Sequence, residues 1–435
     1  MGDAVKATII GGGLAGSEAA WTLAERGVDV TIHEMRPVVQ TAAHQSDRLA
    51  ELVCSNSFKS VELGNAHGLL KAELRRLGSA LLECADDARV PGGAALAVDR
   101  VAFSTLVDER LRAHPRIEIV RGEVAEVPVP GIVATGPLTS ERLAAAIAAR
   151  LGAESLAFYD AIAPIVSDDS LDHERLYRLS RYGKGDGDDY LNAPMNREEY
   201  EAFLDALIAG DQHHGHEFDQ VPYFEGCLPI EEMASRGRET LRFGPMKPVG
   251  LPDPKTGREP YAVVQFRRED KAGQMWNLVG FQTRLRIPEQ QRICRMIPGL
   301  AEAEFLRYGS IHRNSYVNSP KSLGDGLRPK DGAPVFFAGQ LTGVEGYTES
   351  IATGLVAGIN LHRHLSGLTP TVPPPTTMLG GLYRYLREAD PRHFQPMNAN
   401  FGLLDPLPHA LKKSDKRAAL AARALADLDM WARTL

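Results

Sequence analysis

The chain has 435 residues and a net charge of −7, and 43% of its residues are hydrophobic against 24% charged. This composition is ordinary for a globular protein with a buried core, and the length predicts two or three domains. No run of about 18 apolar residues and no signal peptide occurs, so the sequence predicts no membrane contact and a cytoplasmic location. The four cysteines form no CxxC pair, which argues against a zinc site and predicts free thiols.

The first elements predict a βαβ unit. A short apolar strand (7–10) meets a glycine-rich turn (11–16), a helix follows from Leu14 to Arg26, and Gly27 ends it. A second strand (28–33) leads into Glu34. Between residues 57 and 88 the spacing predicts one helix with a continuous apolar stripe that consists of Leu70, Leu74, Leu77, Leu81 and Cys84.

The middle of the chain predicts an inserted domain. After a buried strand at 132–136, residues 186–328 are rich in loops and show no βαβ period. A strand (335–338) and a helix (353–364) follow, then a stiff proline-rich connector (369–376) and a helical tail. We therefore expect segments 1–185 and 329–370 to form one domain, 186–328 to form the insertion, and 371–435 to form a helical C-terminal segment.

The charge of the chain is unevenly distributed. Residues 225–330 contain 18 Lys and Arg against 12 Asp and Glu, in a protein that is acidic as a whole. Such a basic middle is compatible with a face that binds a polyanion, but a solvated surface with ordinary ion pairs explains the surplus better, because a polyanion needs a clustered patch of charge.

The glycine-rich turn predicts a dinucleotide site. It has the pattern G-x-G-x-x-G and consists of Gly11, Gly12, Gly13, Leu14, Ala15 and Gly16. In this pattern the glycines allow a tight turn, a close approach of a pyrophosphate and close packing of helix on strand, and the phosphates lie at the helix N-terminus. Glu34, at the end of the second strand, is placed to accept hydrogen bonds from ribose hydroxyls.

A second glycine-rich segment indicates FAD. The strand 335–338 leads into Gly339 and Gln340, and Gly346 and Tyr347 then open a helix. Flavoproteins of the glutathione-reductase type return to their cofactor in this way, whereas enzymes that use only NAD do not. The predicted fold class is therefore α/β, a glutathione-reductase-like FAD-binding Rossmann fold with an inserted mixed α/β domain and a helical tail.

Five stretches resemble the folate- and FAD-dependent tRNA (uracil-5-)-methyltransferase family, which is itself related to the GidA-like flavoproteins. They are GGGLAGSEAAW (11–21), LVCSNSFKS (52–60), FEGCLPIEEMASRGRETLRFGPMKPVGL (224–251), AGQLTGVEGYTESIATGLVAGIN (338–360) and PMNANFGLL (396–404). The resemblance implies methylation of C5 of a uridine in the T-loop of tRNA. It also implies 5,10-methylenetetrahydrofolate as one-carbon donor, FAD as carrier and reductant, and NADPH or NADH to restore the flavin. DNA is not among the expected partners.

Two cysteines are the candidate catalytic residues. C5 of uracil becomes nucleophilic when a thiolate adds at C6, and Cys227 lies just before a predicted helix start at Pro229, which favours a thiolate. The family resemblance implicates Cys54 as well, near the flavin. We expect Cys84 and Cys294 to be core residues. The basic residues after Cys227 are candidates for phosphate contacts, namely Arg236, Arg238, Arg242 and Lys247.

Other polar features are better explained without a ligand. His213, His214 and His216 lack the neighbouring ligands of a closed metal site, so we expect no metal. Tyr347 suits either stacking on a flavin or folate ring or packing in the core. The basic tail residues Lys412, Lys413, Lys416 and Arg417 suit a solvated helix face better than an RNA contact.

Three alternatives stay open. Some members of the resembled family methylate ribosomal RNA, and the sequence does not separate the two targets. A related flavoprotein installs carboxymethylaminomethyl groups on wobble uridine, but it has a long helical C-terminal domain, whereas only about 75 residues follow Asn360 here. A flavoprotein that binds RNA without catalysis is the third alternative.

Overall fold

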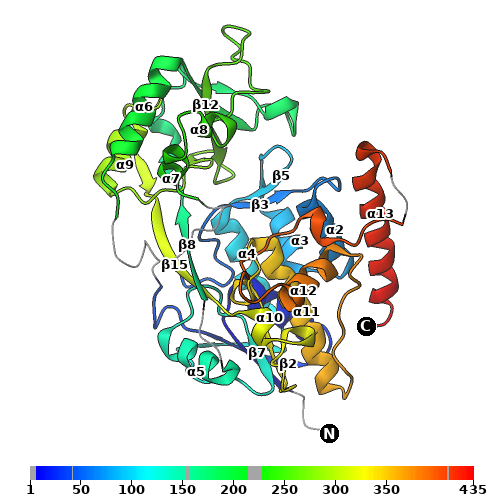
Figure 1. The fold of residues 1–435 in the computed structure, drawn as a ribbon. Coiled ribbons are helices and arrows are strands. Elements are labelled where there is room, and N and C mark those ends of the chain that lie inside the picture. Colours follow the sequence, from blue (N-terminus) through cyan, green and yellow to red (C-terminus); the bar gives the residue numbers. More distant parts are fainter. Residues whose placement is uncertain (1–5, 42, 153–155, 214–227, 409–410) are drawn as a thin grey trace.

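The computed structural model describes residues 6–41, 43–152, 156–213, 228–408 and 411–435. Figure 1 shows a large lower domain, which holds both ends of the chain, and a smaller upper domain built from the middle of the sequence. We call them the core domain and the insertion domain. Strands β8 (Leu156–Ile162) and β15 (Ser310–Tyr316) pair over their full length and run between the two domains.

A parallel sheet of five strands is the centre of the core domain, in the order β16-β7-β1-β2-β6. The strands are β1 (Lys6–Ile10), β2 (Asp29–Glu34), β6 (Ile117–Arg121), β7 (Gly131–Val133) and β16 (Val335–Phe337). β1 pairs with β2 on one side and with β7 on the other. The carboxyl end of β1 therefore lies where the strand order reverses, which is where open α/β sheets bind ligands.

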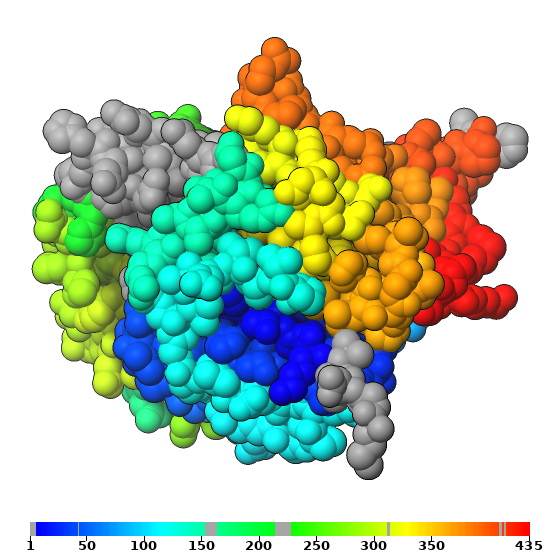
Figure 2. Space-filling model, turned by 90° about the horizontal axis from the view of Figure 1, so that it is seen from below, coloured from blue at the N-terminus to red at the C-terminus, as the bar shows by residue number. Residues whose placement is uncertain are grey.

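Segments that are far apart in the sequence meet in this sheet, because β7 pairs with β1 on one side and with β16 on the other. In the view from below (Figure 2), blue, cyan, yellow and orange segments share this face of the core domain. Helix α1 (Leu14–Ala24) packs closely on helix α11 (Tyr347–Leu365), because Gly354 leaves room for the backbone of α1. A Cβ atom at Gly354 would lie only 2.2 Å from the carbonyl oxygen of Ala15.

Further helices and a small sheet cover the core domain. The small antiparallel sheet has the order β3-β5-β4. Its strands are β3 (Ser57–Ser60), β4 (Arg89–Val90) and β5 (Ala95–Val98). The helices of this domain and of the tail are α2 (Ala66–Arg76), α3 (Ala80–Asp87), α4 (Arg100–Ala113), α5 (Glu141–Leu151), α10 (Ser319–Ser322), α12 (Met378–Glu388) and α13 (Lys413–Ala432).

The prediction of one continuous helix between residues 57 and 88 is wrong. α2 ends at Arg76, Gly78 has a φ of +79°, and the side chain of Ser79 caps the N-terminus of α3. Cys84 is buried as expected. The stripe of leucines continues across the break because both helices pack on the same core.

The insertion domain has a separate hydrophobic core around an antiparallel sheet of six strands, in the order β10-β11-β12-β13-β9-β14. These strands are β9 (Ile165–Ser167), β10 (Tyr177–Arg178), β11 (Tyr190–Met195), β12 (Ala262–Arg268), β13 (Met275–Leu278) and β14 (Phe305–Arg307). The helices are α6 (Arg197–Ala209), α7 (Ile230–Ser235), α8 (Thr240–Phe243) and α9 (Ile287–Cys294). Because β9 and β10 belong to this sheet, it begins about 20 residues before the position 186 that the sequence suggested.

Short 3-10 helices complete the chain, and they are Asp168–Ser170, Arg181–Gly183, Asp325–Leu327, Gln340–Thr342 and Phe401–Leu403. Within the described residues, no helix is long and apolar enough to cross a membrane. The strands and helices predicted at both ends of the chain are confirmed by β1, α1, β2, β7, β16, α11 and α13.

Candidate active site

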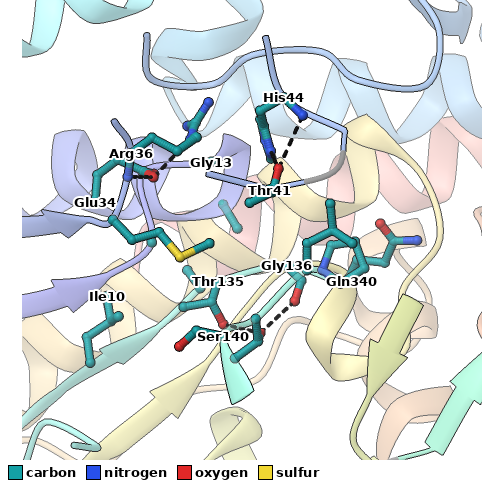
Figure 3. A pocket seen from close by; sticks show the side chains of 18 of the residues that line it. Ile10, Gly13, Glu34, Arg36, Thr41, His44, Thr135, Gly136, Ser140 and Gln340 are labelled. Atoms are coloured by element: carbon teal, nitrogen blue, oxygen red, sulfur yellow. Dashed lines mark hydrogen bonds and ion pairs between the residues drawn. The ribbon is translucent and has the colours of Figure 1, made fainter. Parts of the chain in front are cut away.

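A deep pocket opens at the carboxyl ends of β1, β2 and β7 and encloses about 1020 Å³ of empty space, part of it open to solvent. Figure 3 shows Glu34 and Arg36 on one side, Thr41 and His44 above, Thr135 and Ser140 below, and Gln340 on the opposite side. Residues from both ends of the chain line it, including Gly13, Leu14 and Ala15 of the first turn and Gly339, Gln340, Tyr347 and Ser350 of the second. The structure therefore brings the two predicted glycine segments together around one cavity.

The first glycine turn has the geometry that its pattern predicts. Gly11 has a φ of +101° and its N–H donates to the carbonyl oxygen of His33 at 2.8 Å. A Cβ atom at Gly16 would lie 1.8 Å from the carbonyl oxygen of Gly11, so the start of α1 lies directly against the turn. Gly12 and Gly16 do not line the pocket, whereas Gly13, at the N-cap of α1, does.

Glu34 is a buried carboxylate at the end of β2. Its Oε2 accepts the N–H of Gly12 at 3.0 Å, and its Oε1 accepts the N–H and the Nε–H of Arg36 at 3.0 and 2.9 Å. Burial alone would raise the pKa of Glu34, but the hydrogen bond and the positive charge of Arg36 hold it below its usual value. The predicted ribose-binding acid is therefore ionised and fixed beside the glycine turn.

The segment after β2 covers this end of the pocket, which the sequence did not indicate. Arg36 is buried and also contacts Glu51 at 3.3 Å. The hydroxyl of Thr41 and Nδ1 of His44 are 2.6 Å apart. Burial and the charge of Arg36 lower the pKa of His44 to about 4, so this ring is neutral at physiological pH.

The second glycine segment forms the other end of the pocket. The N–H of Gly339 donates to the hydroxyl of Thr353 at 2.8 Å, and the side-chain amide of Gln340 donates to Glu345 at 2.6 Å. Gly346 is the N-cap of α11 with a φ of +126°, and it supports the helix start without lining the pocket. Tyr347, the first residue of α11, does line it.

Cys54 lies beside this end of the pocket. The N–H groups of Cys54 and Ser55 both donate to the hydroxyl of Tyr347, at 2.9 and 3.0 Å, and that hydroxyl donates to the carbonyl oxygen of Ser55 at 2.9 Å. Burial raises the pKa of Tyr347, and the nearby Cys54 raises it further, so the phenol stays neutral. Cys54 is half-buried and free, and its neighbour Val53 lines the pocket.

Cys227 lies outside the described residues, so its position stays a prediction. The described chain resumes at Leu228, and Pro229 is the N-cap of α7, whose first turn contains Glu231 and Glu232. The helix start that the sequence predicted after Cys227 is confirmed. Cys294 is buried, as expected.

The four candidate phosphate-binding residues do not form one cluster of free charges. Arg238 forms ion pairs with Glu201 and Asp205, and Arg242 pairs with Glu239 while its guanidinium lies 3.6 Å from the ring centre of Tyr261. Arg236 also has an interaction partner. Contacts between these residues and RNA stay a prediction.

A metal site finds no support in the part of the chain that the structure describes, because no group of three or more His, Cys, Asp or Glu side chains there is suited to hold an ion. His213 is among these residues, whereas His214 and His216 lie outside them.

Comparison with known proteins agrees with this geometry. The family model for "Glucose inhibited division protein A" matches residues 6–369. A Geobacter sulfurreducens protein named methylenetetrahydrofolate–tRNA-(uracil-5-)-methyltransferase TrmFO is 58% identical over 430 residues, which is 98% of this chain and 99% of the relative. A Thermus thermophilus protein with the same name is 54% identical over 428 residues, which is 98% of this chain and 96% of the relative.

Among solved structures, GidA of Aquifex aeolicus superposes with a TM-score of 0.70 at 16% identity, over 99% of this chain and 74% of that chain. This likeness confirms the predicted fold class. The long matches at high identity identify the closer group, and the chain belongs to the TrmFO family, within the wider GidA group of proteins.

Proposed function

We propose that the protein methylates C5 of a uridine in the T-loop of tRNA, with 5,10-methylenetetrahydrofolate as one-carbon donor and FAD as cofactor. Relatives named for methylenetetrahydrofolate-dependent methylation of tRNA uracil at position 5 are 54–58% identical over nearly the whole chain. The observation that carries the proposal is the pocket that extends from Glu34 past Gly13 to Tyr347 and ends beside a half-buried cysteine.

The residues of this pocket suit FAD. A Cβ atom at Gly13 would meet no atom within 4 Å, which leaves space for a diphosphate at the N-terminus of α1, where free N–H groups favour negative charge. Glu34 is placed for the ribose of the adenosine half, and Gly339, Gln340 and Tyr347 for the flavin half. When bound, FAD would carry the one-carbon unit and reduce it.

We assign the chemistry at uracil to the two cysteines. The thiolate of Cys227 forms a bond to C6, which makes C5 nucleophilic toward the one-carbon unit. Loss of the proton from C5 and elimination of the thiolate then restore the ring. Cys54, near the flavin half of the pocket, is our candidate for removing that proton or for handling the one-carbon unit.

Three finer points belong to the same proposal. Arg236, Arg238, Arg242 and Lys247 contact phosphates of the RNA, and Arg238 and Arg242 exchange their acidic partners for phosphate when they do so. NADPH or NADH restores the reduced flavin. The enzyme works in the cytoplasm, where its tRNA substrate is found.

The test is a labelling experiment. The purified protein is incubated with NADPH, methylenetetrahydrofolate labelled in the methylene carbon, and an unmodified tRNA transcript, and the digested RNA is searched for labelled 5-methyluridine. We expect label that is lost when S-adenosylmethionine replaces the folate. Label in ribosomal RNA and none in tRNA would move the assignment to the ribosomal target, and no label in either RNA would refute the proposal.

A further inference from the structure

The segment that carries Cys54 lies at the junction of the two domains. On the side of the core domain, the hydroxyl of Tyr347 binds the backbone of Cys54 and Ser55. On the opposite side, residues at the end of β12 of the insertion domain contact the neighbouring Asn56 and Arg100. The position of the Cys54 backbone therefore depends on both domains.

Asn56 joins the domains through one fully buried side chain. Its Nδ2 donates to the carbonyl oxygen of Val98 at 2.9 Å and to that of Arg268 at 2.6 Å, and its Oδ1 accepts from Nε of Arg267 at 2.7 Å. Val98 belongs to the core domain, and the two arginines end β12. Carbonyls only accept and a guanidinium only donates, so this set of partners suits an amide and no carboxylate.

Arg100 and Glu269 form a second link beside the first. Nε and Nη2 of Arg100, the first residue of α4, donate to the two oxygens of Glu269 at 2.6 and 3.2 Å, and Glu269 follows β12 directly. Nη1 of Arg100 donates to the carbonyl oxygen of Leu52 at 3.0 Å. The side chain of Glu269 is only 2% exposed, and a two-pronged pair of this kind is strong and directional.

We propose that Asn56, Arg100 and Glu269 are positioning residues that link the Cys54 segment of the core domain to the insertion domain, so that the placement of the domains and the reactivity of Cys54 are set together. The predicted effect on turnover rests on the proposed function, because Cys54 acts on a substrate only if that function is correct. Its effect on the thiol is independent of that function.

The test compares Glu269→Gln with the unchanged holoenzyme. The substitution keeps the shape of the side chain and removes the charge that holds Arg100. The rate of alkylation of Cys54 by iodoacetamide is followed by mass spectrometry of its peptide, with the buried Cys84 and Cys294 as internal reporters of unfolding. We expect alkylation of Cys54 to be at least fivefold faster, while Cys84 and Cys294 stay protected and the flavin content is unchanged.

A matched control and a conservative variant sharpen the result. Glu73→Gln also replaces a buried acidic side chain, whose pKa burial raises to about 8 and which accepts the N–H groups of Met378 and Leu379 at the start of α12, and it should leave Cys54 alkylation unchanged. Glu269→Asp keeps the charge and should recover most of the protection. In the methylation assay, kcat of Glu269→Gln should fall at least tenfold with KM for tRNA within twofold.

Two results would overturn the inference: Cys54 alkylation within twofold of the unchanged protein, or an equal increase in Glu73→Gln. If Glu269→Gln also exposes Cys84 and Cys294, the test uses Arg100→Lys instead, because this variant keeps the positive charge but loses the two-pronged contact. An unchanged rate in that variant would again overturn the inference. If the unchanged protein methylates no RNA, the proposed function fails while the alkylation ratios still decide on the positioning residues.

Discussion

Replacing Gly13 with alanine should weaken FAD binding without destabilising the fold. Gly13 has an ordinary extended backbone (φ −73°, ψ −169°), and a Cβ atom there meets no protein atom within 4 Å. We therefore expect the free energy of unfolding of the apoprotein to change by no more than about 0.5 kcal/mol. The added methyl group occupies the space of the diphosphate, and overpacking of this kind costs about 1–3 kcal/mol. That cost corresponds to a loss of FAD affinity of roughly 5- to 150-fold.

Gly16→Ala is the matched control in the same turn. Its Cβ atom would lie 1.8 Å from the carbonyl oxygen of Gly11, so the backbone of the turn has to move. Better helix propensity returns at most about 1 kcal/mol. We therefore expect Gly16→Ala to destabilise the apoprotein itself, by about 1–3 kcal/mol or more.

The assay separates the two effects. Flavin is removed, apoprotein stability is measured by urea unfolding, and FAD is titrated back while the fluorescence of the three tryptophans is recorded. The reasoning is refuted if Gly13→Ala binds FAD as tightly as the unchanged protein, or if its apoprotein loses as much stability as that of Gly16→Ala.

Three further predictions concern the surroundings of the pocket. Tyr347→Phe leaves the N–H groups of Cys54 and Ser55 without their acceptor, so urea unfolding should show a loss of about 1–3 kcal/mol, and an unchanged midpoint would contradict this. Glu34→Gln removes the charge that holds Arg36 and Gly12, and FAD affinity measured by titration should fall about tenfold or more; equal affinity would rule out a role in binding. Glu349 is buried, which alone would raise its pKa, but the hydrogen bond and charge of His67 and the charge of Lys59 lower it to about 2. Because this value lies below the 4.5 of the unfolded chain, the stabilisation is present above pH 4.5 and is lost as the pH falls toward 2. In Glu349→Gln the urea midpoint should therefore depend less on pH between 5 and 3. If the midpoint changes with pH equally in both proteins, Glu349 is not the source of this pH dependence.

The glycine turn and Glu34 were predictable because the pattern is local. Gly11, Gly13 and Gly16 lie within six residues. Gly11 and Gly16 make contacts that only a glycine permits, and Gly13 leaves open space at the helix start, so the pattern alone indicates the turn. The return of the chain at Gly339 was predictable for the same reason. The break at Gly78 was missed because apolar spacing does not distinguish one helix from two helices that share a buried face.

The contacts around Cys54 could not be predicted from the sequence. Asn56 meets Arg267 across 211 positions of the chain, and Arg100 meets Glu269 across 169. Nothing in the spacing of either pair connects them, since the contact depends on how the insertion domain sits on the core domain. The roles of Arg36 and His44 over the pocket were hidden for a related reason, because a loop without periodicity gives no indication of the surface it covers.

The pairing of β16 with β7 has a consequence for the synthesis of the chain. The two strands are separated by about 200 residues, and at roughly 5–20 residues per second the ribosome needs about 10–40 s to make that stretch. The insertion domain has a separate core, and all of its residues are synthesised before β16. The core of the first strands, in contrast, is incomplete until β16 and α11 have been synthesised. Nascent chains that end before Phe337 therefore expose the edge of β7 and lack the pocket residues Gly339, Gln340, Tyr347 and Ser350, and these are the chains that chaperones have to protect.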